Sequence, residues 1–161
     1  MKKLASVAAI ASIAVLAACG SHKTTTVTTS NGTATITQDQ NGQQTSVTTK
    51  EGTVTVGGSA DPNALGAPVY PGATKNDDQS SFIVTGKDAG AYAAFKTADA
   101  FDKVYDYYKS QLPAGSEKMK MASGDTSLAE FDMKDPKGET LVEVQGKTGE
   151  TVIIITHKAQ Q

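Results

Sequence analysis

The clearest periodic pattern along the chain lies between residues 99 and 112. Apolar side chains recur there at spacings of three and four, which places them on one face of a helix. The stripe is formed by Phe101, Val104, Tyr105, Tyr108 and Leu112. Pro113 follows the stripe and ends the helix, while Thr97 or Asp99 can cap its start. The pattern predicts an amphipathic helix over residues 99–112.

Alternation of apolar and polar residues predicts strands on both sides of this helix. The expected strands cover residues 81–85 and 91–96 before it, and 118–121, 128–133, 140–145 and 151–157 after it. Residues 152–155 are apolar at every position, which is typical of a central strand covered on both faces. The order ββαββββ predicts an α+β domain in which one helix packs on a twisted antiparallel sheet.

Residues 23–58 have a different character, since they are rich in threonine and lack aromatic residues and leucine. Turn signals recur every ten residues, at Asn31-Gly32, Asn41-Gly42 and Glu51-Gly52. Short runs of alternating Thr and Val lie between them, which is typical of a meander of β-hairpins. The apolar side chains are few and small, so their burial hardly offsets the entropy of ordering the chain. A β-hairpin segment and a flexible polar stalk both remain open.

The first eighteen residues have the composition of a secretory signal. Lys2 and Lys3 precede an uncharged run from Leu4 to Ala18, and a basic start followed by a short apolar stretch is the pattern of an export signal. A membrane-spanning helix needs roughly 18 or more apolar residues, and this run is too short to span a bilayer comfortably. We therefore expect residues 1–18 to be removed after export.

The boundary sequence Leu16-Ala17-Ala18-Cys19 resembles the bacterial lipobox. The resemblance implies that Cys19 is acylated through a thioether, that the chain is cleaved before it, and that the new amine is capped with an acyl chain such as palmitate. Two or more acyl chains hold a protein firmly to a bilayer. Because Gly20 follows the cysteine instead of an inner-membrane retention aspartate, the expected address is the outer membrane, facing the periplasm.

These features divide the chain into a signal peptide (1–18), a lipid-anchored Thr-rich repeat or stalk (19–60) and an α+β globular domain (61–161). Residues 61–68 are expected to form the linker into that domain. Residues 68–73, 97–108 and 112–113 resemble small exported bacterial lipoproteins without an assigned activity. The resemblance implies the address and the fold and transfers no catalytic residue.

Charge and cysteine content restrict the partners. All 15 basic residues are lysines, and removal of residues 1–18 leaves 13 of them against 17 acidic residues, a formal charge of −4. Nucleic acids and phosphates are recognised through basic patches and the bidentate arginine fork, so we expect no nucleic-acid partner. Cys19 is the only cysteine, which rules out a disulfide within the chain.

The sequence offers little chemistry for catalysis. It contains no nucleophile elbow and no Walker or dinucleotide glycine pattern. A metal site at His157 would need Glu130 or Glu143 from neighbouring strands, and a solvated histidine is the expected alternative. Carboxylates could converge as a hydrolytic pair, and the candidates are Asp88, Asp125, Glu130 and Glu143. We expect no catalytic, metal or cofactor-binding residue.

Two features are candidates for an interaction surface. Tyr107 lies at the edge of the helical stripe, beside Tyr105 and Tyr108 within it, and an amphipathic ring at a rim suits binding. Ordinary packing is the alternative. If the second sheet face is uncovered, an apolar patch would mark an interaction site, formed by Leu128, Leu141, Ile153 and Ile155. Alternatively, the Thr-rich hairpins fold back and cover that face.

The sequence therefore predicts a non-enzymatic binding or structural module of the cell envelope, tethered by lipid at Cys19, with an envelope protein as its possible partner. Two alternatives stay open. One is a hydrolase of envelope polymers that uses paired carboxylates. The other is a periplasmic carrier of a small apolar ligand.

Overall fold

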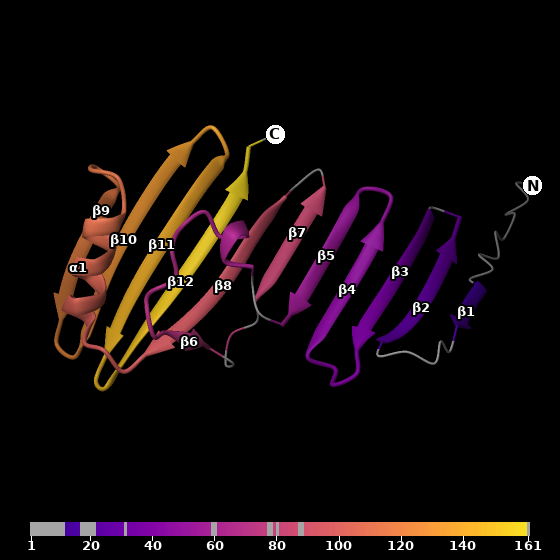
Figure 1. Cartoon of the computed structure of the whole chain (residues 1–161), viewed down its shortest axis with the longest axis horizontal. Coiled ribbons are helices and arrows are strands. Elements are labelled where there is room, and N and C mark those ends of the chain that lie inside the picture. Colours follow the sequence, from indigo (N-terminus) through magenta and orange to yellow (C-terminus); the bar gives the residue numbers. More distant parts are fainter. Residues whose placement is uncertain are drawn as a thin grey trace, which may run out of the picture.

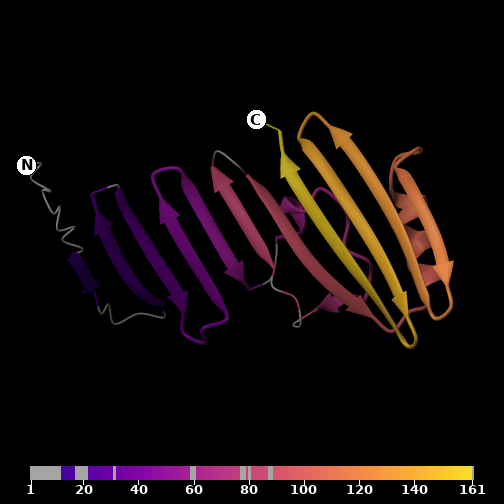
Figure 2. The ribbon, with the colours of Figure 1, turned by 180° about the vertical axis from the view of Figure 1, so that it is seen from behind.

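A computed structural model describes residues 12–16, 22–30, 32–58, 61–76, 79, 81–86 and 89–160, with the backbone alone described for residues 12–16. These residues form one open antiparallel sheet of twelve strands, with an α-helix at one end of it (Figure 1). The N-terminal strands lie at one end of the sheet and the helix-covered strands at the other, in both views (Figures 1 and 2).

The strand bounds are β1 (Ser12–Leu16), β2 (His22–Thr29), β3 (Gly32–Asp39), β4 (Gln44–Thr49), β5 (Gly52–Gly57), β6 (Thr74–Lys75), β7 (Phe82–Gly86), β8 (Gly90–Thr97), β9 (Glu117–Ser123), β10 (Thr126–Asp135), β11 (Gly138–Lys147) and β12 (Glu150–Ala159). The helices are the 3₁₀ turn η1 (Pro62–Ala64) and α1 (Phe101–Gln111). The order across the sheet is β1-β2-β3-β4-β5-β7-β8-β12-β11-β10-β9, and β6 pairs with β8.

This architecture corrects the predicted fold class. The ββαββββ α+β domain with a separate Thr-rich segment is wrong, because the described chain is mostly strand and its sheet is single and open. β5 pairs with β7 through Val54 with Val84 and Val56 with Phe82. The Thr-rich hairpins therefore extend the sheet sideways and do not fold back over it. Joining the edge of β7 satisfies backbone groups that would otherwise lack partners.

Strands β2–β5 form without a large apolar core. Threonine is favoured in strands because its branched side chain packs well on a pleated surface. Hydroxyl groups also pair across neighbouring strands, at 3.3 Å between Thr28 and Thr33 and at 3.0 Å between Thr48 and Thr53. Such cross-strand pairs each add a few tenths of a kcal/mol, about 0.2–1. Many small contributions thus replace the few large ones of a packed core.

The core lies between the sheet and the elements that cover one face of β8, β12, β11 and β10. Helix α1 packs on β11 and β12, and the chain before β6 covers the same face. The buried cluster includes Leu65, Tyr70, Ala93, Val104, Tyr105, Tyr108, Phe131, Val142, Val144, Ile153 and Ile155. We call this side of the sheet the covered face. The Tyr108 hydroxyl donates to the Pro68 carbonyl at 3.1 Å, and burial raises the pKa of Tyr108.

The predicted linker is part of this core. Leu65 and Ala67 are buried, so the segment after η1 packs on the sheet and does not merely connect two regions. Gly66 has a φ of +68°, and a Cβ at this position would collide with Thr140 Oγ1. Glycine is required here because the backbone passes close to β11 in a left-handed conformation.

Helix α1 begins at Phe101, two residues after the predicted start at residue 99, and neither predicted cap, Thr97 or Asp99, is its N-cap. The N-cap is Ala100, which makes no side-chain capping bond. The Thr97 hydroxyl accepts instead from the Asp99 backbone N–H at 3.2 Å. The Asp99 carboxylate accepts from the Tyr70 hydroxyl at 2.7 Å and from Lys103 Nζ at 2.9 Å. Asp99 thus ties the first turn of the helix to the segment before β6.

Removal of the Phe131 ring tests the position of the core. Phe131 is fully buried on the covered face, and truncation of a buried phenylalanine costs about 3–5 kcal/mol because it leaves a cavity. We expect Phe131→Ala to lower the free energy of unfolding by that amount in urea titrations. Met121→Ala, at a residue that is 51% exposed, is the control and should change it by less than about 0.5 kcal/mol.

Acid should weaken the structure in part through Asp99. The hydrogen bond from Lys103, followed by that from Tyr70, lowers the pKa of Asp99. A carboxylate with a lowered pKa stabilises the fold above the pKa of the unfolded group, about 3.9, and this stabilisation is lost as the pH falls through the folded pKa. We expect the melting temperature of Asp99→Asn to fall less between pH 6 and pH 2 than that of the unsubstituted chain.

A second carboxylate provides the control for this pH dependence. Asp125 lies in the exposed turn between β9 and β10, and Asp125→Asn removes one carboxylate without touching the Asp99 contacts. Thermal melts of Asp125→Asn should keep the unsubstituted pH dependence. Equal flattening in both variants would show that the Asp99 contacts do not contribute to the acid sensitivity.

Candidate interaction surface

The side of the sheet opposite the covered face carries a row of apolar side chains across almost every strand. We call this side the open face. The row consists of Val27, Ala34, Ile36, Val47, Val54, Val56, Phe82, Val84, Tyr92, Ile154, Leu141, Leu128, Met119 and Met121, which the strand register places on one side. Figure 2 views the sheet from this side, with α1 behind the strands.

The middle of the row is the most exposed continuous part. Val56 pairs with Phe82, and Phe82 pairs in turn with Tyr92. The rings of Phe82 and Tyr92 stack at a centroid distance of 5.3 Å and an angle of 8°. Val54, Val56 and Phe82 are 40%, 42% and 39% exposed. Contiguous exposed apolar residues of this kind usually mark a binding surface.

The opposite side of β2–β5 is hydroxylated. Alternate residues of these strands place hydroxyl groups on the side that continues the covered face, and we call it the threonine face. Its residues are Thr24, Thr26, Thr28, Thr33, Thr35, Thr37, Ser46, Thr48, Thr53 and Thr55. The sheet therefore has an apolar and a polar side even where no helix covers it.

The open face is acidic at its β10–β11 end. Glu130 pairs directly with Glu143, and like charges opposite one another destabilise a sheet slightly. Next to them, Asp132 Oδ1 is buried and accepts no hydrogen bond within the described chain. A carboxylate oxygen left without a donor is costly, and it adds to the concentration of negative charge at this end.

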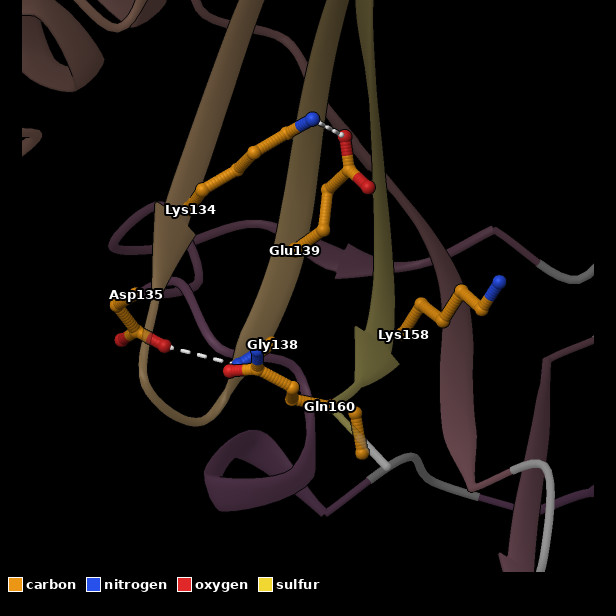
Figure 3. Close-up of a pocket in the computed structure, with 7 residues that line it drawn as sticks. Lys134, Asp135, Gly138, Glu139, Lys158 and Gln160 are labelled. Carbon is orange, nitrogen blue, oxygen red and sulfur yellow. Dashed lines mark hydrogen bonds and ion pairs between the residues drawn. The ribbon is translucent and has the colours of Figure 1, made fainter.

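Two adjoining hollows lie at the same end. One, of about 310 Å³, is lined by Glu130, Asp132, Glu139, Leu141, Thr156 and Lys158. The second, of about 410 Å³, shares Glu139 and Lys158 and lies against the β10–β11 turn. Figure 3 shows Lys134 and Glu139 reaching toward each other from β10 and β11, at 2.9 Å. The hydrogen bond to Glu139 raises the pKa of Lys134.

The helical tyrosines do not form the predicted surface. Tyr105 and Tyr108 are buried in the core, so neither ring is available to a partner. Tyr107 is half-buried and makes edge-to-face contacts with Tyr70 and Tyr108, both at 5.1 Å. The Tyr105 hydroxyl donates to Glu117 at 2.8 Å, and this hydrogen bond is the largest influence that lowers the pKa of Glu117.

The predicted sheet patch is half right. Leu128 and Leu141 lie on the open face, but Ile153 and Ile155 are fully buried on the covered face. Residues 152–155 are apolar at every position, so the sequence could not show whether the odd-numbered or the even-numbered residues face the helix. Sequence reasoning also missed Val54, Val56 and Phe82. The alternation of the β5 strand was a signal for Val54 and Val56.

The candidate catalytic and metal-binding residues are separated by the sheet. His157 Nδ1 lies 2.8 Å from Thr140 Oγ1 on the covered face, whereas Glu130 and Glu143 lie on the open face. Of the candidate carboxylates, Glu130 and Glu143 are brought together, Asp125 is in an exposed turn, and Asp88 lies outside the described residues. Among the described residues no group of three or more potential metal ligands occurs.

Cys19 lies outside the described residues. The β1 strand belongs to the segment that the sequence predicts is removed, and β2 begins three residues after Cys19. Within the described part of the chain, no helix has the length and hydrophobicity needed to cross a bilayer.

Comparisons with known proteins place no relative beside this chain. No protein-family model matches it, no curated protein is similar to it, and no solved structure shares its fold at a significant level.

Proposed function

We propose that the chain is an exported lipoprotein, anchored in the outer membrane through Cys19, that acts as a non-enzymatic binding module of the cell envelope. The observation that carries the proposal is the uncovered apolar row of the open face. The mature chain would offer this face to another envelope polypeptide from the periplasmic side of the membrane.

The size of the open face suits a protein partner. Strands lie about 4.8 Å apart and residues on one side of a strand about 6.7 Å apart, so the ten strands from β2 to β9, with about three such residues each, cover about 43 by 20 Å. This is on the order of 800 Å², the area that each partner contributes to a standard protein interface. The two hollows occupy only one end of this much larger surface, which favours a broad contact over a small ligand.

Charge defines the chemistry of the partner. At the β10–β11 end the open face carries Glu130, Asp132, Glu139 and Glu143 against Lys134 and Lys158. The β2–β5 part of the same face carries no carboxylate. A complementary partner therefore has an apolar strip with basic groups at one end, since opposite charges across an interface fix its register.

The anchor would lie at the end of the sheet opposite the helix. β2 follows Cys19 closely in the sequence, and nine strand spacings separate β2 from β9 at the far edge. At about 4.8 Å per spacing, the helix-covered end is about 43 Å from the anchored end. The Thr-rich hairpins would thus act as a stiff extension that presents the open face over that length.

Acylation can be tested directly. Cells that express the chain should incorporate radiolabelled palmitate into it, and mass spectrometry should find a product that begins at acylated Cys19. Cys19→Ser should abolish the label and leave residues 1–18 attached, because cleavage in lipoprotein maturation follows acylation. An unlabelled product that is cleaved elsewhere or shed from the cell would contradict the anchor.

Charge substitutions test the open face. In Val54→Lys/Val56→Lys, ammonium groups replace exposed apolar side chains, and burial of an unpaired charge in an interface costs several kcal/mol. We expect recovery of a crosslinked envelope partner to fall at least about tenfold, for which about 1.4 kcal/mol suffices. The matched control is Thr33→Lys/Thr48→Lys, which adds the same charges to exposed positions on the threonine face.

Two outcomes would contradict this assignment. Equal loss of the partner in both double variants would show that the open face is not the contact. Hydrolysis of an envelope glycan by the unsubstituted chain, lost in Glu130→Gln or Glu143→Gln, would instead support the paired-carboxylate alternative.

A further inference from the structure

The two ends of the sheet are protected to very different degrees against pairing with another strand. β9 carries Glu117, Lys118 and Lys120, and its pairing with β10 is interrupted by a bulge between Glu130 and Phe131. Charged side chains and bulges are the devices by which proteins prevent edge-to-edge association. The β9 end of the sheet is therefore guarded.

The β2 strand has much less of this protection. Its sequence is His-Lys-Thr-Thr-Thr-Val-Thr-Thr, with Lys23 as the only residue that carries a full charge, and with no proline. Its register with β3 is continuous over eight pairs, without a bulge. A regular strand rich in Thr and Val, with a single charged residue near its start, is the kind of edge on which another strand adds readily.

The structure itself shows that this edge accepts a strand. β1 pairs with β2 in antiparallel register over five residues, from Ser12 with Thr28 to Leu16 with Thr24. The β2–β3 hairpin closes at Thr29 and Gly32 across a two-residue turn, and such a turn closes on a hydrogen-bonded pair. Backbone groups alternate along a strand, so those of Thr24, Thr26 and Thr28 point outward.

We propose that, once residues 1–18 are removed, β2 pairs with β2 of a second copy and joins two molecules into one continuous antiparallel sheet. The inference rests on the lipoprotein processing of the proposed function, which takes β1 away. Removal of β1 leaves the outward groups of β2 without partners, and an identical strand satisfies them on both molecules.

The second copy fits because the strand is complementary to itself. In a two-fold antiparallel pair centred on Thr26, each Thr24 lies opposite Thr28 of the other copy, and all these side chains lie on the threonine face. The sheet already uses such pairs, as between Thr28 and Thr33 at 3.3 Å. Hydroxyl pairs across strands contribute favourably.

Charge does not oppose this pairing. In the same register the two copies of Lys23 are six residues apart along the strands, about 20 Å at 3.4 Å per residue. This exceeds the screening length of about 8 Å at physiological salt. A register centred on Thr25 also keeps each face continuous, but it places Lys23 beside Val27 of the second copy and brings the two lysines closer together.

Membrane attachment favours the contact. The lipid-bearing residue lies three positions before β2, so every anchored copy would hold the same edge at the same height above one bilayer. Confinement raises the effective concentration of one edge for another. The same confinement does not favour the β9 edge, which lies at the far end of the sheet.

Cysteine crosslinking in native membranes tests the proposal. Thr26→Cys places the only free thiol of the processed protein on the edge, since the Cys19 sulfur is held in a thioether. Directly opposed residues have Cα atoms about 4.5–5.5 Å apart, within the range of a disulfide. Mild oxidation should give a disulfide-linked dimer, and Ala122→Cys on the β9 edge should give at least about tenfold less.

Proline variants separate pairing from folding. Thr24→Pro removes an outward N–H, which an edge strand tolerates, and should abolish the crosslink of Thr26→Cys without lowering the melting temperature by more than a few degrees. Ala122→Pro, on the guarded edge, is the matched control and should leave the crosslink intact. Thr25→Cys reports the alternative register.

The outcomes distinguish the two proposals. A protein that is acylated and cleaved at Cys19, yet gives no dimer through residue 25 or 26, overturns the pairing of β2 and leaves the lipoprotein assignment standing. A protein that retains residues 1–18 overturns both. Cys19→Ser combined with Thr26→Cys keeps β1 in place and should give no dimer, because β1 occupies the edge.

Discussion

The backbone pairing of β5 with β7 is the contact on which the rest of the arrangement depends. Through it the Thr-rich hairpins, which bury little apolar surface of their own, gain a neighbour that is held by a packed core. This pairing also determines which residues of β2–β5 lie on each side of the sheet, because a shift of one residue in the register would move every side chain of these strands to the other side. The alignment of Val54, Val56 and Phe82 on the open face follows from this single register.

Much of the local structure could be predicted from the sequence. The stripe of Phe101 to Leu112 matches α1, and each expected strand lies within or beside an observed one. The overall class could not be predicted, because alternation shows that a strand has two unlike faces but not which strand becomes its neighbour. The Pro- and Gly-rich composition of residues 61–68 likewise resembled a linker, although Leu65 and Ala67 complete the core. That segment also contacts the helix, since the Tyr108 hydroxyl donates to the Pro68 carbonyl.

The two sides of the sheet differ in role, and the candidate catalytic residues are divided between them. The covered face of β8–β12 packs against the helix and the segment before β6, and His157 lies on this face. The open face keeps the carboxylates Glu130 and Glu143 together, but on a broad surface that is largely apolar elsewhere. Such a surface suits recognition of a macromolecule, where affinity comes from area and charge position more than from one enclosed pocket.

The ten-residue repeat of the turns at Asn31-Gly32, Asn41-Gly42 and Glu51-Gly52 has a further consequence. Each hairpin of two strands adds about 10 Å to the width of the sheet. Insertion or loss of a whole hairpin in evolution would change the distance between the anchor and the core in steps of this size. The side of the sheet on which every other residue lies would stay the same. The β2–β5 segment thus sets the distance between the lipid anchor and the packed core, and this distance can change without any change in the core itself.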